Sequence, residues 1–389
     1  MNIGIDIRCL MDKQRTGVGE YTYNLLNALF ECNNTDGEID NADKNQYFLF
    51  YNSSSDVSKL IPKWGGNNIH YVGTKWPNKL LNLLVWLKFI KLDNLVIKNC
   101  FKIYNLKFKI DTWFSPNLNF TNLSRGVKHI QTIHDLSFEI LPECFTWKRR
   151  LWHWFLNPKK QCQKADLIVV PSENTRRDII NKFQISNFKF QILRPGLSEK
   201  FKANSSQPID VVKEKYNLPE KFILFLGTLE PRKNIKTIIE AFINSKLLAS
   251  GYELILAGSL GWKNKKLLKL IQSTPGVKYI GYVDDKDKPA LYKLCELFIF
   301  PSLYEGFGLP VLEAMACGTP VITSNRSSLP EVGGEAVCLV NPYNVEEIAE
   351  AMNNILKNKE LIELMVVKLK TKAESFNWEK TAYEFLNCF

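Results

Sequence analysis

The sequence predicts an α/β protein made of two similar units. Short apolar runs rich in β-branched and aromatic residues alternate with helical stretches, and this series starts again near residue 222. Between the two series, residues 194–219 contain prolines and a polar stretch that interrupt both patterns. Strands that alternate with helices need parallel crossovers and are buried on both faces, which explains why they form apolar runs.

The first unit begins with a strand and a helix in which Val18, Tyr21, Leu25 and Leu29 recur at helical spacing. Residues 33–45 are polar enough for a mobile loop, and residues 378–385 predict a terminal helix with an apolar face. We expect domains over residues 1–200 and 201–375, followed by a returning helix within 376–389. Strands are expected at 3–6, 47–51, 69–72, 112–114, 129–133, 167–170 and 190–193, and then at 222–226, 254–257, 277–279, 297–300, 321–323 and 337–340.

Composition indicates an ordinary globular protein, because the 389 residues are 45% hydrophobic and 23% charged. Nine cysteines without Cys-x-x-Cys spacing favour neither a disulfide framework nor a zinc site. The N-terminus reaches Asp6 in an alternating strand pattern, unlike a signal peptide, so we expect a cytoplasmic protein. The most apolar run, 80–87, is too short to cross a bilayer.

The excess positive charge lies in the front half of the chain. Residues 1–200 carry 28 Lys and Arg against 18 Asp and Glu, whereas residues 201–389 carry 23 against 22. Residues 51–134 hold 12 basic and 3 acidic side chains among aromatic residues, and the basic stretch 59–109 suggests contact with an anionic membrane. The alternative is a Lys- and Asn-rich background whose apolar positions face the core. We find no nucleic-acid-binding module around this charge.

Three segments carry candidate chemistry. Gly17 and Gly19 open the first helix, where a backbone can approach an anion closely, although a Gly-x-Gly alone is more often a tight turn. Gly227 is followed by Arg232 and Lys233 at the carboxyl end of a strand, where open α/β sheets bind ligands and a diphosphate needs positive charge. Basic pairs are more often solvated.

The third segment, residues 301–320, is the most informative. It leaves a strand, passes through Gly306 and Gly308, and enters a helix with Pro310 in its first turn. The free amides of that helix can bind a phosphate or a sugar. Glu305 and Glu313 lie eight residues apart on either side of the glycines, and the helix dipole explains one acid near a helix start but not this pair.

Taken in order, these segments resemble the retaining glycosyltransferases of the GT4 type, which have the GT-B architecture. Besides the glycines and the Glu-x7-Glu pair, the resemblance includes residues 132–136 and 170–175, and so covers nearly the whole chain. It implies two Rossmann-like domains facing across a cleft, with a nucleotide-sugar donor mostly on the second and the acceptor on the first. The final helix would return to the first domain. Similarity to bacterial mannosyltransferases suggests GDP-mannose, or else a UDP-hexose, as donor.

The resemblance also implies roles for single residues. Arg232 and Lys233 would neutralise the donor diphosphate, Glu313 would bind the ribose, and Glu305 would contact the transferred sugar. His134 would touch the donor sugar beside the reacting carbon. The implied catalytic residues are therefore His134, Glu305, Arg232 and Lys233. The implied donor-binding residues are Gly17, Gly19, Gly227, Arg232, Lys233, Glu305, Gly306, Phe307, Gly308, Leu309 and Glu313.

One position departs from the family pattern, since Thr228 stands where many members carry an arginine. Because Arg232 and Lys233 are adjacent, the sequence leaves open which of them takes which part in neutralising the donor diphosphate. We expect no metal and no cofactor beside the nucleotide-sugar, and we interpret Asp285 and Asp287 as capping and solvated residues. The acceptor would be a glycan or a lipid-linked molecule. The alternatives are a nucleotide-sugar epimerase on the same fold and a non-catalytic membrane- or glycan-binding relative.

Overall fold

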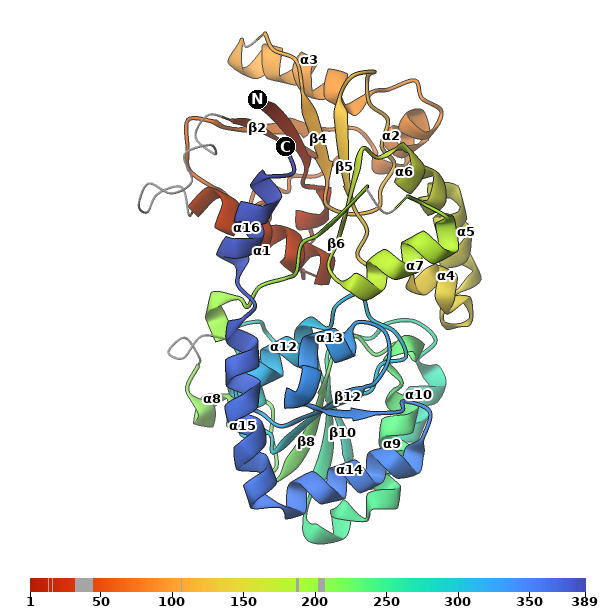
Figure 1. Cartoon of the computed structure of the whole chain (residues 1–389), viewed down its shortest axis with the longest axis vertical. Coiled ribbons are helices and arrows are strands. Elements are labelled where there is room, and N and C mark those ends of the chain that lie inside the picture. The colour runs from red at the N-terminus through yellow and green to blue at the C-terminus, as the bar shows by residue number, and fades with distance from the viewer. Residues whose placement is uncertain (13, 16, 32–44, 106, 187–188, 202–206) are drawn as a thin grey trace.

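The structure, a computed structural model, describes all residues except 13, 16, 32–44, 106, 187–188 and 202–206. It contains two parallel sheets, one in each half of the chain, and each sheet has helices on both faces (Figure 1). The first has seven strands in the order β3-β2-β1-β4-β5-β6-β7, and the second has six in the order β10-β9-β8-β11-β12-β13. Both orders are those of a Rossmann fold. The expected pair of Rossmann-like domains is confirmed.

Every strand expected in the first unit is present. The strands are buried on both sides: Ile3 and Ile5 pack with α1 and α16, and Phe50 and Trp113 belong to the core under α2 and α3. The strands are β1 (Asn2–Asp6), β2 (Gln46–Asn52), β3 (Ile69–Thr74), β4 (Thr112–Ser115), β5 (Lys128–Thr132), β6 (Leu167–Val170) and β7 (Phe190–Ile192). The helices are α1 (Gly17–Glu31), α2 (Asn78–Trp86), α3 (Leu92–Tyr104), α4 (Ser137–Ile140), α5 (Trp147–Leu156), α6 (Pro158–Lys164) and α7 (Glu173–Phe183). The expected loop at 33–45 lies, except for Asn45, outside the described residues.

The strands expected in the second unit are also confirmed. Phe222 to Leu226 are buried throughout, as an apolar run in the middle of a parallel sheet predicts. The strands are β8 (Phe222–Leu226), β9 (Glu253–Ala257), β10 (Val277–Gly281), β11 (Leu297–Phe300), β12 (Val321–Ser324) and β13 (Cys338–Val340). The helices are α8 (Ile209–Lys215), α9 (Ile235–Ser245), α10 (Lys265–Ser273), α11 (Lys288–Leu294), α12 (Leu309–Ala316), α13 (Leu329–Gly333), α14 (Val345–Lys357) and α15 (Lys359–Glu374).

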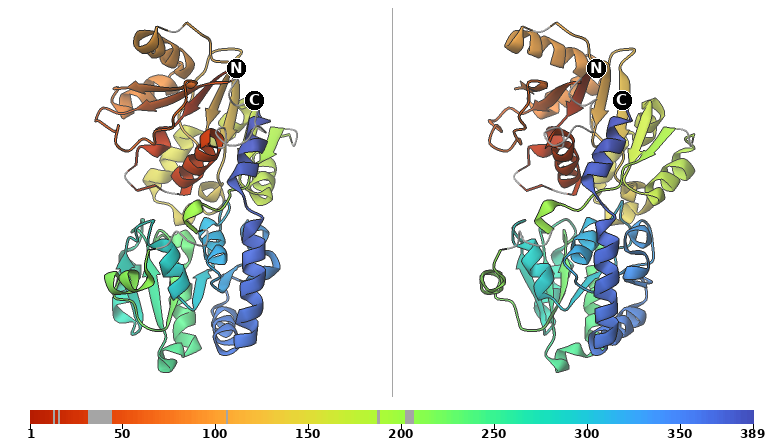
Figure 2. Two further views of the ribbon diagram at one scale, coloured as in Figure 1. Left: turned by 90° about the vertical axis from the view of Figure 1, so that its left-hand side faces the viewer. Right: turned by 60° about the vertical axis from the view of Figure 1, so that its left-hand side comes forward.

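The last helix, α16 (Trp378–Leu386), returns to the first domain and lies beside α1 (Figures 1 and 2). Trp378 and Phe385 are buried in the core of the first domain with Tyr21. The returning chain runs beside the outgoing one: the N–H of Leu197 donates to the carbonyl of Phe376 at 3.0 Å, and the hydroxyl of Thr381 donates to the carbonyl of Arg194 at 2.6 Å. Part of the expected linker, 202–206, lies outside the described residues.

Two global features bear on the sequence expectations. Within the described ranges, no helix combines the length and the apolar character needed to cross a bilayer. The eight described cysteines are all free, and five of them are buried. These five buried cysteines act as small core residues.

Candidate functional site

Three loops at the carboxyl ends of strands carry most of the predicted site residues, and they meet where the two domains face each other. His134 follows β5, Lys233 follows β8, and Glu305 follows β11. Strands β8 and β11 are neighbours at the point where the strand order of the second sheet reverses. The loops after such a pair diverge to opposite faces of the sheet, which leaves a place for a ligand between them.

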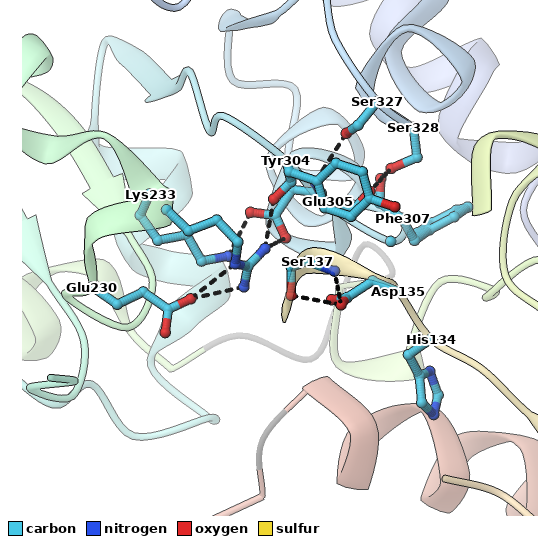
Figure 3. Close-up of polar contacts among 12 residues, drawn as sticks. His134, Asp135, Ser137, Glu230, Lys233, Tyr304, Glu305, Phe307, Ser327 and Ser328 are labelled. Atoms are coloured by element: carbon cyan, nitrogen blue, oxygen red, sulfur yellow. Dashed lines mark hydrogen bonds and ion pairs between the residues drawn. The ribbon is translucent and has the colours of Figure 1, made fainter. Parts of the chain in front are cut away.

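Glu305 joins the two predicted cations (Figure 3). Its Oε1 accepts a hydrogen bond from Nζ of Lys233 at 2.6 Å, and its Oε2 accepts one from Nη1 of Arg232 at 2.8 Å. Arg232 also donates to the carbonyl of Tyr304 at 2.6 Å and, through Nη2, to Glu230 Oε1 at 2.8 Å. The four charged side chains form one nearly buried network, which we call the Glu305 cluster (Glu230, Arg232, Lys233 and Glu305).

Burial and charge act in opposite directions on the pKa values of this cluster. Burial alone would raise the pKa of Glu305, but the charges of Arg232 and Lys233 overcome it and lower that pKa to about 2. Burial lowers the pKa of Lys233, and the carboxylate of Glu305 offsets part of that effect. Glu305 is therefore ionised at neutral pH and compensates the two cations.

Glu230 was not foreseen as a site residue. It follows β8 in the same loop as the two cations, is 5% exposed, and accepts two hydrogen bonds from Arg232. An acidic residue two positions before a basic pair was the available signal in the sequence. Thr228, at the departure from the family pattern, is exposed.

The glycine-rich segment forms the N-terminus of α12, as predicted. Gly308 has a φ of +113°, a backbone conformation that favours glycine, and the helix starts directly after it with Pro310 in its first turn. The hydroxyl of Ser328 donates to the carbonyls of Glu305 and Phe307 at 2.9 and 2.8 Å, which fixes the loop (Figure 3). Pro310 has no N–H and the amide of Val311 donates to the carbonyl of Gly308 at 2.9 Å, so the amides that can meet an anion are those that lead into the helix, at Phe307, Gly308 and Leu309.

Glu313 lies on α12, apart from the Glu305 cluster. Its Oε2 accepts a hydrogen bond from the hydroxyl of Tyr292 at 2.9 Å. Burial raises the pKa of Glu313, and the charge of Lys288 opposes this increase. The two glutamates of the Glu-x7-Glu motif therefore lie in different electrostatic environments.

The first domain contributes His134. Its Nε2 lies 2.8 Å from the carbonyl oxygen of Pro116, which can only accept, so Nε2 carries a proton. The ring meets that of Tyr21 edge-on, with centroids 5.0 Å apart. Burial lowers the pKa of His134, so the ring is neutral at pH 7 and its Nδ1 has a free lone pair. The next residue, Asp135, accepts hydrogen bonds from the amide and hydroxyl of Ser137 (Figure 3).

Gly306 brings the domains into direct contact. A Cβ at this position would lie 2.0 Å from the carbonyl oxygen of His134, so no larger residue fits without movement. The hydroxyl of Ser172, which precedes α7, donates to the carbonyl of Gly306 at 2.7 Å. The carbonyl groups of His134 and Gly306, and with them the loops after β5 and β11, are thus held close together.

Two further contacts cross the domain boundary and were not foreseen. The carboxylate of Glu331 accepts hydrogen bonds from the amides of Glu173 and Asn174 at the start of α7, at 2.9 and 2.6 Å. The hydroxyl of Tyr304 donates to Asp178 at 2.5 Å. Residues 170–175 resembled the family motif without suggesting a role, and these contacts show that α7 of the first domain docks on the second.

Gly17 and Gly19 begin α1 but differ in their surroundings. A Cβ on Gly17 would meet nothing within 4 Å, whereas one on Gly19 would lie 3.3 Å from the carbonyl oxygen of Cys9. Gly17 is exposed and Gly19 is buried. Packing accounts for Gly19, while the space at Gly17 is open to a ligand.

The interpretation of Asp285 and Asp287 is wrong in part. Asp287 stands at the N-cap position of α11, but its side chain makes no capping bond. It is 2% exposed and binds Nζ of Lys215 at 2.6 Å and the hydroxyl of Tyr216 at 2.8 Å. A basic partner in α8 makes this acid a structural ion-pair residue, which local spacing could not indicate. In the part of the chain that the structure describes, no three His, Cys, Asp or Glu side chains gather in a metal-binding group.

A cavity of about 960 Å³ lies elsewhere along the domain boundary. It is lined by α1, residues near 197–201, the ends of α11 and α12, α15 and the start of α16. Its lining contains none of the predicted site residues. The candidate site is therefore defined by the chemistry of the loops and not by this cavity.

Comparisons with known proteins agree with this geometry. The model of the family described as glycosyl transferases group 1 matches residues 206–372, which include β8, β11 and the Glu305 cluster. O-antigen chain mannosyltransferase B of Escherichia coli is 33% identical over 276 residues, which cover 70% of this chain and 72% of that protein. The chain belongs to the glycosyl transferases group 1 family.

Other members of the family are longer. The serotype-specific mannosyltransferase WbdA of Escherichia coli is 32% identical over 264 residues, 66% of this chain, but the match spans only 32% of WbdA.

Among solved structures, sucrose-phosphate synthase of Thermosynechococcus elongatus has a TM-score of 0.73 at 19% identity, with 100% of this chain and 98% of that one covered. WaaG, a glycosyltransferase involved in lipopolysaccharide biosynthesis, has a TM-score of 0.68 at 15% identity and 98% coverage of both chains. These structures share the GT-B fold of this glycosyltransferase.

Proposed function

We propose that this glycosyltransferase moves a mannosyl residue from a nucleotide-sugar to a hydroxyl group of a glycan or lipid-linked acceptor, with retention of the anomeric configuration. GDP-mannose is the first candidate donor and a UDP-hexose the second. The two Escherichia coli relatives, both mannosyltransferases, support mannose. A neighbour that shares the fold, HepE of Anabaena, has been solved with UDP-glucose, which supports a nucleotide-sugar.

The observation that carries this proposal is the Glu305 cluster beside the N-terminus of α12. Arg232 donates through Nε, Nη1 and Nη2 to Glu230, Glu305 and the carbonyl of Tyr304. Lys233 has three donors, and among the described residues one of them bonds Glu305. We therefore assign the diphosphate to Lys233 and the amides of Phe307, Gly308 and Leu309, with Arg232 positioning the loop in the absence of an arginine at 228.

In the proposed reaction the bond between the anomeric carbon and the phosphate oxygen breaks, and its electron pair goes to the diphosphate. The acceptor oxygen forms its bond to the anomeric carbon on the same face, and its proton passes to the departing phosphate oxygen. Fixed positive groups stabilise the developing negative charge without having to reorganise. His134 would contact the transferred sugar from the first domain.

Since Lys233 and the α12 amides would supply the positive charge, we propose that transfer needs no divalent cation. Activity measured with excess EDTA is expected to equal activity measured with Mg²⁺. A loss of transfer in EDTA that Mg²⁺ restores would refute this part of the proposal.

A donor panel tests the proposed function. A donor at about one hundred times its dissociation constant stabilises the folded protein by about 2.7 kcal/mol, so GDP-mannose is expected to raise the melting temperature more than UDP-glucose. With the stabilising donor, proton NMR of the product is expected to show the donor's anomeric configuration. We expect nucleoside diphosphate to be released only when an acceptor is present. An epimerase would act without an acceptor, and a binding protein would release no nucleoside diphosphate. An inverted product would reject retention.

A further inference from the structure

The first domain exposes an aromatic surface that the proposed reaction does not use. Trp147 and Trp154 of α5 are 69% and 71% exposed, and Phe89, just after α2, is 76% exposed. The rings of Trp86 and Phe155 meet edge-on with centroids 6.0 Å apart, so the two helices present one continuous surface. We call it the α2–α5 patch, consisting of Trp86, Phe89, Trp147, Leu151, Trp154 and Phe155. An apolar area of this kind on a soluble domain marks an interaction surface.

The two segments that carry the patch contain charges of one sign. Residues 75–91 contain four lysines and no acidic residue, and residues 147–164 contain six basic residues and no acidic residue. Arg150, Lys159 and Lys160 are exposed. Aromatic rings among Lys and Arg side chains are the composition that binds the interface of an anionic bilayer, where the rings enter the headgroup layer and the cations meet anionic lipids.

The helix that carries four of the six patch residues, α5, also packs toward the candidate site through other side chains. Phe138 of α4 stacks on His153 of α5 with ring centroids 4.1 Å apart, and α4 begins just after His134 and Asp135. The guanidinium of Arg149 lies 4.0 Å from the centroid of the Trp262 ring in the second domain. Figure 1 shows α5 on the side of the first domain that faces α7 and the domain boundary.

We propose that the α2–α5 patch docks this protein on an anionic lipid bilayer. The sequence suggested a membrane contact within residues 59–109, and the structure adds α5, which lies outside that stretch and carries the most exposed tryptophans. A second copy fits less well, because a symmetric dimer would place the same basic residues opposite each other. This inference does not depend on donor or sugar identity, since docking requires no turnover.

Vesicle co-sedimentation without donor or acceptor tests the proposal. The full chain is expected to bind vesicles of phosphatidylglycerol and phosphatidylcholine at low salt, to bind pure phosphatidylcholine at least about tenfold more weakly, and to be released from the anionic vesicles at high salt. The double variant Trp147→Ala with Trp154→Ala is expected to bind at least about tenfold more weakly. Its matched control, Tyr343→Ala with Tyr383→Ala, removes two aromatic rings that are 58% and 54% exposed elsewhere and is expected to bind normally.

The charge is tested separately. Replacing Arg150, Lys159 and Lys160 by Ala is expected to weaken binding at least about tenfold, whereas the same change at the exposed Lys265, Lys266 and Lys269 of α10 is expected to have little effect. Gel filtration without vesicles tests whether a second copy of the chain covers the patch instead of a bilayer. Equal binding by patch and control variants, or a dimer that the Trp147 and Trp154 substitutions dissociate, would overturn the proposal. Transfer to a short water-soluble acceptor is expected to stay unchanged in the patch variants, so failure here is distinguishable from failure of the proposed function.

Discussion

Nζ of Lys233 lies 2.6 Å from Oε1 of Glu305, although the two residues are 72 positions apart in the chain. Both side chains are at most 10% exposed. The second oxygen of the same carboxylate holds Arg232, so one acid orients both cations. The following substitutions separate what each member of this arrangement does.

Glu305→Gln is expected to lower both stability and activity. Loss of the carboxylate leaves two buried cations with less negative charge to compensate them, which costs about 3 kcal/mol, measurable by urea unfolding. We expect the transfer rate to fall at least about 100-fold because the cations lose their fixed positions. Glu346→Gln, at an exposed position of α14, is the control. Wild-type turnover by a folded Glu305→Gln protein would remove Glu305 from the site.

Lys233→Ala is expected to weaken binding of the free nucleoside diphosphate about 10- to 100-fold, because it removes charge-assisted hydrogen bonds worth about 1.5–3 kcal/mol. Isothermal titration measures this directly. Lys236, three residues further along, has a side chain that is 75% exposed and serves as the matched control. If Lys236→Ala weakened binding as much as Lys233→Ala, the effect would be one of general charge and not of a specific contact.

Gly306→Ala tests the approach of the two domains. The new methyl group would lie 2.0 Å from the carbonyl oxygen of His134, so the loops must separate. A displacement of about 1 Å at a reacting centre costs about 100-fold in rate, and we expect a loss of this size in kcat. Gly65→Ala, whose Cβ meets nothing within 4 Å, is the control. Unaltered kinetics in Gly306→Ala would show that the site does not require this contact.

Gly17→Ala separates packing from ligand approach. Because a Cβ at Gly17 meets nothing within 4 Å, the melting temperature without ligand is expected to stay within about 1 °C of wild type. If the donor phosphates approach this backbone, the substitution is expected to raise the KM for the donor at least about threefold. A normal KM would place the diphosphate away from the start of α1.

The buried histidines predict sensitivity to mild acid. Burial lowers the pKa of His129 from its ordinary 6.5 to about 4, so between these values the unfolded chain binds a proton that the folded chain does not. The contribution of the neutral histidine to the free energy of unfolding is therefore fully present above pH 6.5. It is lost as the pH falls toward 4, by about 1.4 kcal/mol per pH unit for each such group.

Urea unfolding between pH 7.5 and 4.5 measures this slope. His129→Gln is expected to reduce this slope by the contribution of about one proton. The rest of the slope comes from His70, His134 and His153, whose pKa values burial also lowers. Glu305, with its pKa near 2, contributes only below pH 4.5. An unchanged slope in His129→Gln would contradict the assignment.

The sheets were predictable because their signal is local. A strand buried on both faces, such as Phe222–Leu226, is apolar at every position, and each range expected as a strand contains one in the structure. The glycines and Pro310 around α12 were predictable for the same reason, because the backbone itself demands them.

The partners of charged residues were not predictable in this way. Glu230 and the pairing of Glu305 with Lys233 depend on loops that only the fold brings together, and Asp287 finds its partner in α8. Trp147 and Trp154 were missed because aromatic residues in a helix usually indicate a core face. Their exposure follows from how α5 packs, and helical spacing alone does not specify it.

The polypeptide passes between the two lobes at two places that lie side by side, where Leu197 is bonded to Phe376 and Arg194 to Thr381. Because both crossings lie at one edge, we expect rotation about that edge to be the least restricted movement of the two domains. Spectroscopic labels at Lys263 and Glu143, which are bonded across the domain boundary, are expected to report this rotation, whereas labels next to the two crossings are expected to move little.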